Sequence, residues 1–163
     1  MRNHVNPITD NSTVAQAREY VAERLEEGVT CPACHRHAQR YRRKINAGMA
    51  RAMVLLYREH MRGHEWVMLR SVLLRERTHT GDYAYLVHWG LLEAADERLE
   101  DGNSAGFWRL TESGRAFVAH GLKVPKYVHL YNGQLQTVSG PQIGIAECIG
   151  DTFNLRELIE RAA

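Results

Sequence analysis

The sequence lacks the features that mark a membrane, secreted or strongly charged protein. No apolar run approaches the roughly 18 residues that a membrane-spanning helix needs, and residues 1–10 lack the apolar core of a signal peptide. The formal net charge of the 163-residue chain is only +2, so its composition as a whole favours neither nucleic acid nor a membrane as partner. We therefore expect a cytoplasmic protein with one core and appended elements, and no membrane contact.

Common catalytic motifs are also missing. The sequence contains no nucleophile elbow, no His-Glu-x-x-His helix, no phosphate-binding loop and no dinucleotide fingerprint. Its nine histidines are scattered, and several stand near arginines, which suits surface positions better than an acid-base site. We expect no enzymatic activity.

The three cysteines are too few for the disulfide framework of a small secreted protein. Cys31 and Cys34 have the spacing with which two thiolates on a tight turn hold zinc. Further ligands are required, for which His37, Cys148 and a second subunit are candidates, and Cys31, Cys34 and His37 are the predicted set. A reduced pair with a purely structural role is the alternative. Cys148 stands among apolar residues and is expected to be buried.

Two helices are predicted before residue 64. The first spans residues 13–27, with an N-cap at Ser12-Thr13, a helical apolar stripe and Gly28 as stop. After the turn-rich cysteine segment, a longer helix is predicted from about Arg42 to Gly63, because apolar residues recur on one helical face.

The middle of the chain has the pattern of a helix-turn-helix followed by a hairpin. We expect a short buried helix within residues 65–74, a break at residues 78–81, and a helix at residues 83–89 capped by Asp82. A hairpin over residues 93–111 would form a wing, and a further helix would run from a Thr111 cap to Gly121.

The C-terminal segment contains a strong hairpin signal. Asn132-Gly133 separates two alternating strands, residues 127–131 and 134–138, and a last helix is predicted at residues 155–161. We expect an α+β fold in three parts: an N-terminal helix with the Cys-x-x-Cys knuckle (1–44), a winged helix-turn-helix core (45–121), and a hairpin with a helix on the same core (122–163).

Two strings in the middle of the chain resemble winged-helix proteins of the kind found among bacterial regulators. They are the segment from Tyr85 to Glu93 and the segment from Phe107 to Phe117. The resemblance covers about a third of the chain and implies the end of a recognition helix, a wing and the helix packed beneath it. Winged helices bind DNA, but they also serve as protein-interaction and dimerisation modules.

A wider arrangement of short motifs resembles a set of small uncharacterised bacteriophage proteins. The motifs are the Cys-Pro-x-Cys knuckle, residues 40–46, Met49-Ala50, residues 124–128 and the Asn132-Gly133 turn. This resemblance implies a phage-encoded regulator in the host cytoplasm and carries no assigned activity.

Positive charge is concentrated between Arg36 and Arg62, where eight arginines and lysines face Glu59 alone. We expect this part of the second helix to contact phosphates, with a merely solvated helix face as the alternative. The predicted nucleic-acid contacts are Arg40, Arg42, Arg43 and Lys44 on this helix, and Arg75, Arg77, Thr78, His79, Thr80, Tyr83 and Tyr85 around the recognition helix.

Two functions follow from these patterns. The first is a winged-helix regulator that binds double-stranded DNA, and the alternative is an adaptor or inhibitor that binds a host protein through the winged helix or the C-terminal hairpin. The basic stretch favours DNA, whereas the acidic segment at residues 96–101 would repel a phosphate backbone. A homodimer is compatible with both.

Overall fold

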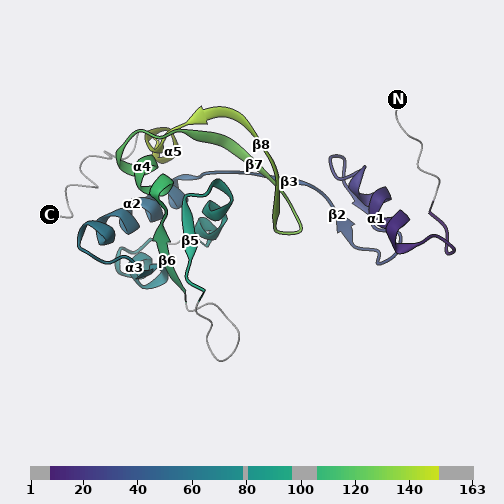
Figure 1. Cartoon of the computed structure of the whole chain (residues 1–163), viewed down its shortest axis with the longest axis horizontal. Helices are drawn as coiled ribbons and strands as arrows, with labels where there is room; N and C mark the ends of the chain where they lie inside the picture. The colour runs from purple at the N-terminus through teal and green to yellow at the C-terminus, as the bar shows by residue number, and fades with distance from the viewer. Residues whose placement is uncertain (1–7, 79–80, 97–105, 151–163) are drawn as a thin grey trace. The chain divides into compact units, whose positions relative to one another are not determined.

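The computed structural model describes residues 8–78, 81–96 and 106–150, which form a mixed α+β structure with small antiparallel sheets (Figure 1). The α+β class is confirmed. The elements are α1 (Val14–Ala22), β1 (Val29–Thr30), β2 (His37–Ala38), β3 (Tyr41–Lys44), α2 (Ala47–Met61), β4 (Val67–Met68), α3 (Leu69–Arg75), the 3₁₀ helix η1 (Asp82–Trp89), β5 (Leu92–Ala94), β6 (Phe107–Leu110), α4 (Glu112–Ala119), β7 (Val124–Tyr131), β8 (Gln134–Ile143) and α5 (Ile145–Ile149).

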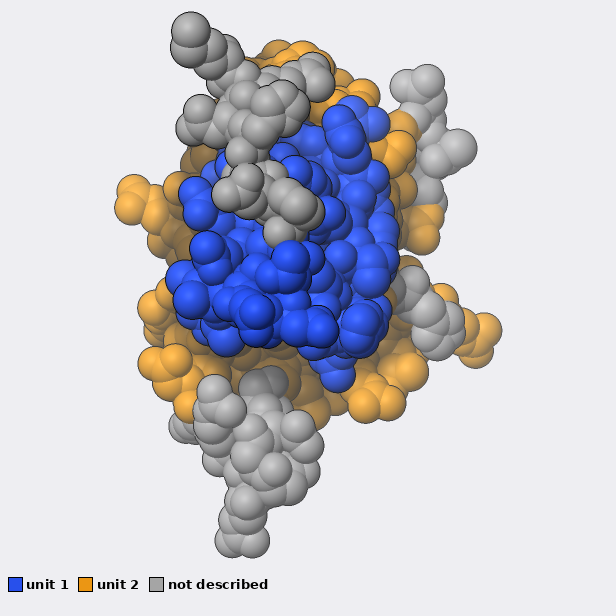
Figure 2. Space-filling view, turned by 90° about the vertical axis from the view of Figure 1, so that its right-hand side faces the viewer, with its two compact units in different colours: residues 1–43, 129–137 blue, residues 44–128, 138–163 orange. Residues whose placement is uncertain are grey.

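The chain divides into two compact units, which Figure 2 distinguishes by colour. Unit 1 comprises residues 1–43 and 129–137, and unit 2 comprises residues 44–128 and 138–163. The division at residue 43 falls beside the boundary predicted at residue 44. The hairpin predicted within residues 122–163 is shared between the two units.

Unit 1 contains a short helix over a small apolar core. The helix begins with a capping box, in which the Gln16 amide donates to Thr13 Oγ1 (3.2 Å) and the Thr13 amide donates to Gln16 Oε1 (2.7 Å). Ala17, Val21 and Leu25 are buried. Of the predicted Ser12-Thr13 pair, Thr13 is the cap. The predicted end is wrong, because α1 stops at Ala22 and residues 23–27 continue as turns.

The basic segment before α2 is a strand, which corrects the prediction of a helix from Arg42. The backbone amide of Arg40 donates to the Leu25 carbonyl (2.8 Å), and β3 then joins a three-stranded sheet of order β3-β7-β8. Helix α2 starts only after Asn46, whose side chain accepts from the Met49 amide (2.9 Å). Arg42, Arg43 and Lys44 therefore lie on a strand.

Unit 2 is built around α2. This helix buries one long apolar face and contacts α3, η1, β6, α4 and α5. Of these, α3, α4, α5 and β6 are labelled near it in Figure 1. A second sheet of order β4-β6-β5 is antiparallel, with Val67 opposite Trp108 and Glu93 opposite Arg109. Buried side chains of α2, α3, η1, β6, α4 and α5 form one continuous core.

Helix α4 closes this core through a close backbone approach. The Thr111 hydroxyl accepts from the Gly114 amide (3.0 Å) and donates to the Gly90 carbonyl (2.6 Å), which confirms Thr111 as the cap. A Cβ atom at Gly114 would lie 2.0 Å from the Leu91 carbonyl oxygen. Glycine is therefore the residue that lets α4 pack against this backbone.

The elements predicted between Glu65 and Gly90 are confirmed with changes. Residues 67–68 pair as a strand before α3, so the predicted helix begins later than expected. The second helix is present as η1, but Asp82 is not its cap, because Gly81 occupies that position without a side-chain hydrogen bond. Gly90 ends η1 at φ 68°, as predicted.

Both predicted hairpins have their strands in place. β5 pairs with β6, whereas the predicted turn at residues 101–106 falls mostly outside the described residues, like the helix at residues 155–161. The Asn132-Gly133 turn joins β7 to β8, with both residues at positive φ, as a tight hairpin of this type requires.

Within the parts of the chain that the structure describes, no helix is long and apolar enough to span a membrane.

Candidate nucleic-acid and cysteine sites

Strand β3 displays the basic segment to solvent. All four of its residues, Tyr41 to Lys44, are exposed, and β3 lies at an edge of its sheet. Arg40, just before the strand, has a different role, because its guanidinium forms an ion pair with Glu26 and its side chain is only 23% exposed. Arg42, Arg43 and Lys44 are thus exposed, whereas the Arg40 side chain is largely buried.

Arg75, predicted to contact DNA, is engaged within unit 2. Its Nη2 donates to Glu59 Oε1 (2.7 Å), and Glu59 also binds Arg62 Nη1 (3.0 Å) and His64 Nδ1 (2.9 Å). Glu59 is 6% exposed and is the buried charged residue of the described core. This cluster ties the end of α2 to the end of α3, so part of the charge of Arg75 is neutralised inside the unit.

The same cluster controls the ionisation of Glu59. Burial by itself raises the pKa of this carboxyl, but hydrogen bonds from His64 and Arg75, with the charges of Arg75 and Arg62, outweigh it and hold the pKa of Glu59 below its ordinary value. Glu59 is therefore a carboxylate that three neighbours stabilise. Prediction from sequence missed this role, although Glu59 is the single acid in the basic stretch.

The segment after α3 offers one exposed cation. Arg77 is exposed and adopts a left-handed backbone conformation at φ 51°. The Thr78 amide donates to the Leu73 carbonyl (2.9 Å), and Thr78 is half-buried. His79 and Thr80 lie outside the described residues.

Helix η1 turns its aromatic residues inward. Tyr83 and Tyr85 pack half-buried against the core, and the Tyr83 ring meets the Trp108 ring edge-on with centroids 5.4 Å apart. The exposed positions of η1 carry Asp82, Ala84 and Val87. The structure therefore gives both tyrosines a packing role and leaves this helix no exposed Arg, Asn or Gln for base recognition.

Prediction from sequence also missed an ion cluster on the β5–β6 hairpin. Arg109 on β6 binds Glu93, its cross-strand partner on β5, and Glu65 before β4, and its guanidinium lies 4.4 Å above the Trp66 ring. These contacts fix the three strands at one end of the sheet. These contacts could not be read from the sequence, because the register of β5 and β6 decides which residues face each other.

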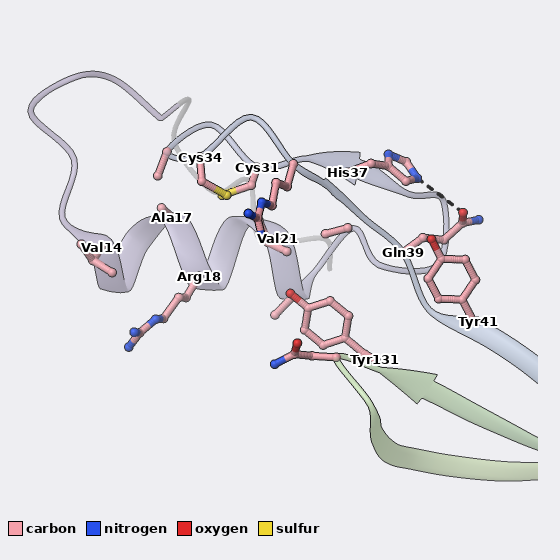
Figure 3. Close-up of a pocket in the computed structure, with 15 residues that line it drawn as sticks. Val14, Ala17, Arg18, Val21, Cys31, Cys34, His37, Gln39, Tyr41 and Tyr131 are labelled. Atoms are coloured by element: carbon pink, nitrogen blue, oxygen red, sulfur yellow. Dashed lines mark hydrogen bonds between the residues drawn. The ribbon is translucent and has the colours of Figure 1, made fainter. Parts of the chain in front are cut away.

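The two neighbouring cysteines lie on the turn that joins β1 to β2 (Figure 3). The Cys31 amide donates to the Arg36 carbonyl (2.8 Å), and the His35 amide donates to the Cys31 carbonyl (2.9 Å). His35 adopts φ 58°, a left-handed conformation that histidine tolerates better than most residues. The turn thus keeps a tight knuckle although it has no glycine at this position.

The knuckle stabilises negative charge on one sulfur. Hydrogen bonds from the backbone amides of Cys34 and Ala33, and then from the Cys34 thiol, hold the pKa of Cys31 below its ordinary value. Cys34 is exposed and Cys31 is partly exposed. Cys148 differs, because burial raises its pKa to about 11. It is half-buried against the core of unit 2, less completely buried than predicted.

His37 is not brought to the cysteines. Its Nε2 lies 3.4 Å from Gln39 Oε1 and its ring packs over Gly28, and Figure 3 shows it turned away from Cys31 and Cys34. No group of three or more metal-binding side chains occurs among residues 8–78, 81–96 and 106–150. The structure therefore brings together two of the three predicted metal ligands.

A mainly apolar hollow of about 760 Å³ opens beside the knuckle within unit 1 (Figure 3). It is lined by side chains of α1, of the cysteine turn and of the β7–β8 turn. Two of the lining residues, Val14 and Tyr41, are 64% and 52% exposed. Its lining is formed by Val14, Ala17, Arg18, Val21, Ala22, Cys31, Ala33, Cys34, Arg36, His37, Ala38, Gln39, Tyr41, Tyr131 and Asn132.

Comparison of the chain with protein-family models, with curated proteins and with solved structures found no match.

Proposed function

We propose that the chain is a winged-helix protein that binds double-stranded DNA mainly through its phosphates. The order of elements in unit 2 supports the fold: helix α2, strand β4, helices α3 and η1, then the hairpin β5–β6 and helix α4. The sheet order β4-β6-β5 places the hairpin beside the first strand, as a wing that follows a helix-turn-helix requires.

The observation that carries DNA binding is the exposure of β3. Three consecutive cations, Arg42, Arg43 and Lys44, stand on an extended backbone with no acidic residue between Arg36 and Lys44. An exposed basic strand can neutralise phosphates and release their counterions, a contribution that does not depend on base sequence. Arg77 is a further exposed cation in unit 2.

The same structure argues against strong sequence recognition by η1. Its exposed side chains are an acid, an alanine and a valine, whereas bidentate base contacts need arginine, asparagine or glutamine. We therefore propose binding with a steep salt dependence and little base preference.

The test is a titration of labelled random-sequence duplex DNA at several salt concentrations, with fluorescence anisotropy as the readout. The Arg42→Ala/Arg43→Ala variant should bind more weakly at every salt concentration. The slope of log K against log salt should fall by about 2, since each phosphate that the protein no longer neutralises lowers it by roughly one.

The matched control is Arg70→Ala/Lys123→Ala, which removes two exposed positive charges elsewhere and should change the slope little. Absence of DNA binding by the wild-type chain at low salt, or equal losses of affinity in the two variants, contradicts a role for β3.

Strand β8 favours the adaptor function as a second candidate. Its residues from Gln134 to Gln142 are exposed, none of them is charged, and β8 forms the other edge of the β3-β7-β8 sheet. An uncharged edge strand can accept a strand from a protein partner, although Pro141 blunts its last part. If β8 binds a protein partner, the Arg42→Ala/Arg43→Ala variant should still bind that protein. The Leu135→Lys/Val138→Lys variant should not bind it.

A further inference from the structure

We propose that Cys31 and Cys34 of two copies of this chain hold one zinc ion between them, so that the knuckle is a metal-dependent dimer contact. This proposal does not depend on DNA binding.

Coordination chemistry favours a second copy. Structural zinc is bound by four ligands, of which thiolates are the preferred type. One knuckle supplies two sulfurs, and no described residue joins them as a third metal-binding side chain. His37 lies on the same hairpin, but its ring is turned toward Gln39. Two copies supply four thiolates, a complete tetrahedral set.

The knuckle is presented in a way that suits a contact between chains. It occupies the turn of the two-stranded β1–β2 hairpin, and Cys34 is exposed. The Cys31 amide donates to the Arg36 carbonyl (2.8 Å) and the His35 amide donates to the Cys31 carbonyl (2.9 Å), so the backbone already holds both cysteines on one tight turn. Hydrogen bonds of this kind orient a metal ligand before the ion arrives.

The surface beside the knuckle fits a second copy of the same surface. The hollow is mainly apolar, and Val14 and Tyr41, which line it, are both more than half exposed. Burial of such a rim against its own copy stabilises association. Zinc with four thiolates carries two negative charges, which the exposed Arg18 and Arg36 of each copy, lining the same hollow, offset.

Binding requires no oxidant or reductant. Four thiol S–H bonds release their protons to the buffer, four Zn–S bonds form, and the oxidation states of zinc and sulfur do not change.

The experiment measures metal content and mass in the absence of DNA. Untagged protein is purified with zinc and a non-chelating reductant, then analysed by elemental analysis and native mass spectrometry. We expect a dimer that carries one zinc ion and that dissociates into metal-free monomers when a strong chelator is added. A monomer with its own zinc ion, a metal-free folded protein in zinc-containing buffer, or a dimer that survives chelation overturns the proposal.

Variants separate the knuckle from other effects. Cys34→Ser should lose both zinc and the dimer, whereas Cys148→Ala, the matched removal of a thiol in unit 2, should retain both, as should His37→Ala. Circular dichroism of Cys34→Ser checks that the chain still folds. Zinc retained at the wild-type ratio in Cys34→Ser, or absent from Cys148→Ala or His37→Ala, places the ion elsewhere and contradicts the proposal.

Discussion

The two units of this protein differ in how much apolar surface each buries. Unit 2 has a continuous core around α2, whereas the buried apolar residues of the N-terminal part of unit 1 are Ala17, Val21 and Leu25. A small unit buries too little surface to outweigh its conformational entropy easily, and metal ions or association with another chain commonly supply the difference. The contrast supports the proposed zinc contact at the cysteine knuckle of unit 1.

The largest predicted loss of stability comes from a substitution in the core of unit 2. Phe117 is fully buried, and Phe117→Ala should lower the free energy of unfolding by about 3–5 kcal/mol through reduced burial and the cavity left behind. Urea denaturation followed by tryptophan fluorescence measures this, because Trp66, Trp89 and Trp108 all belong to unit 2. An unchanged urea midpoint would show that this residue is not central to the core.

The next effect tests the close approach at α4. Gly114→Ala introduces a Cβ atom that would lie 2.0 Å from the Leu91 carbonyl oxygen, so α4 must shift, at a cost of about 1–3 kcal/mol. The control is Ser113→Ala, an exposed position on the same helix. Thermal unfolding of the two variants should differ by several degrees, and equal melting temperatures would contradict such close packing of α4.

The third prediction tests how much the buried carboxylate Glu59 stabilises unit 2. Glu59→Gln should lose about 1–2 kcal/mol of stability at neutral pH, because the buried carboxylate accepts charged hydrogen bonds. A carboxyl with a lowered folded-state pKa stabilises above its ordinary pKa of 4.5, and this contribution disappears as the pH falls below that value. Urea unfolding at several pH values should show the variant and the wild type converging in acid; a constant difference would contradict this ionisation.

The last prediction compares the alkylation rates of one thiol in each unit, Cys31 and Cys148. In chelator-treated, reduced protein at pH 8, Cys31 should be alkylated about ten times faster than Cys148, because a pKa of about 11 leaves Cys148 little thiolate, partly offset by the higher nucleophilicity of that thiolate. Peptide mass spectrometry after timed iodoacetamide treatment measures both rates. Equal rates would mean that the two thiols have similar environments.

The candidate sites show where prediction from sequence succeeded and where it did not. The spacing of Cys31 and Cys34 was enough to place both on one tight turn, because two intervening residues leave the chain little freedom. The cationic character of Arg42, Arg43 and Lys44 was equally visible. Their placement on a strand was not, because four polar residues carry no periodic apolar signal and pairing with β7 decided their conformation.

Local chemistry in the sequence determined the caps at Thr13 and Thr111, the stop at Gly90 and the Asn132-Gly133 hairpin, since each depends on a few neighbouring residues and their backbone preferences. Tertiary structure alone decided that Arg40 binds Glu26, that Arg75 binds Glu59 and that Tyr83 packs on Trp108. These pairs join residues 14 to 25 positions apart, and side chains so far apart meet only after packing has set the register and orientation of whole elements.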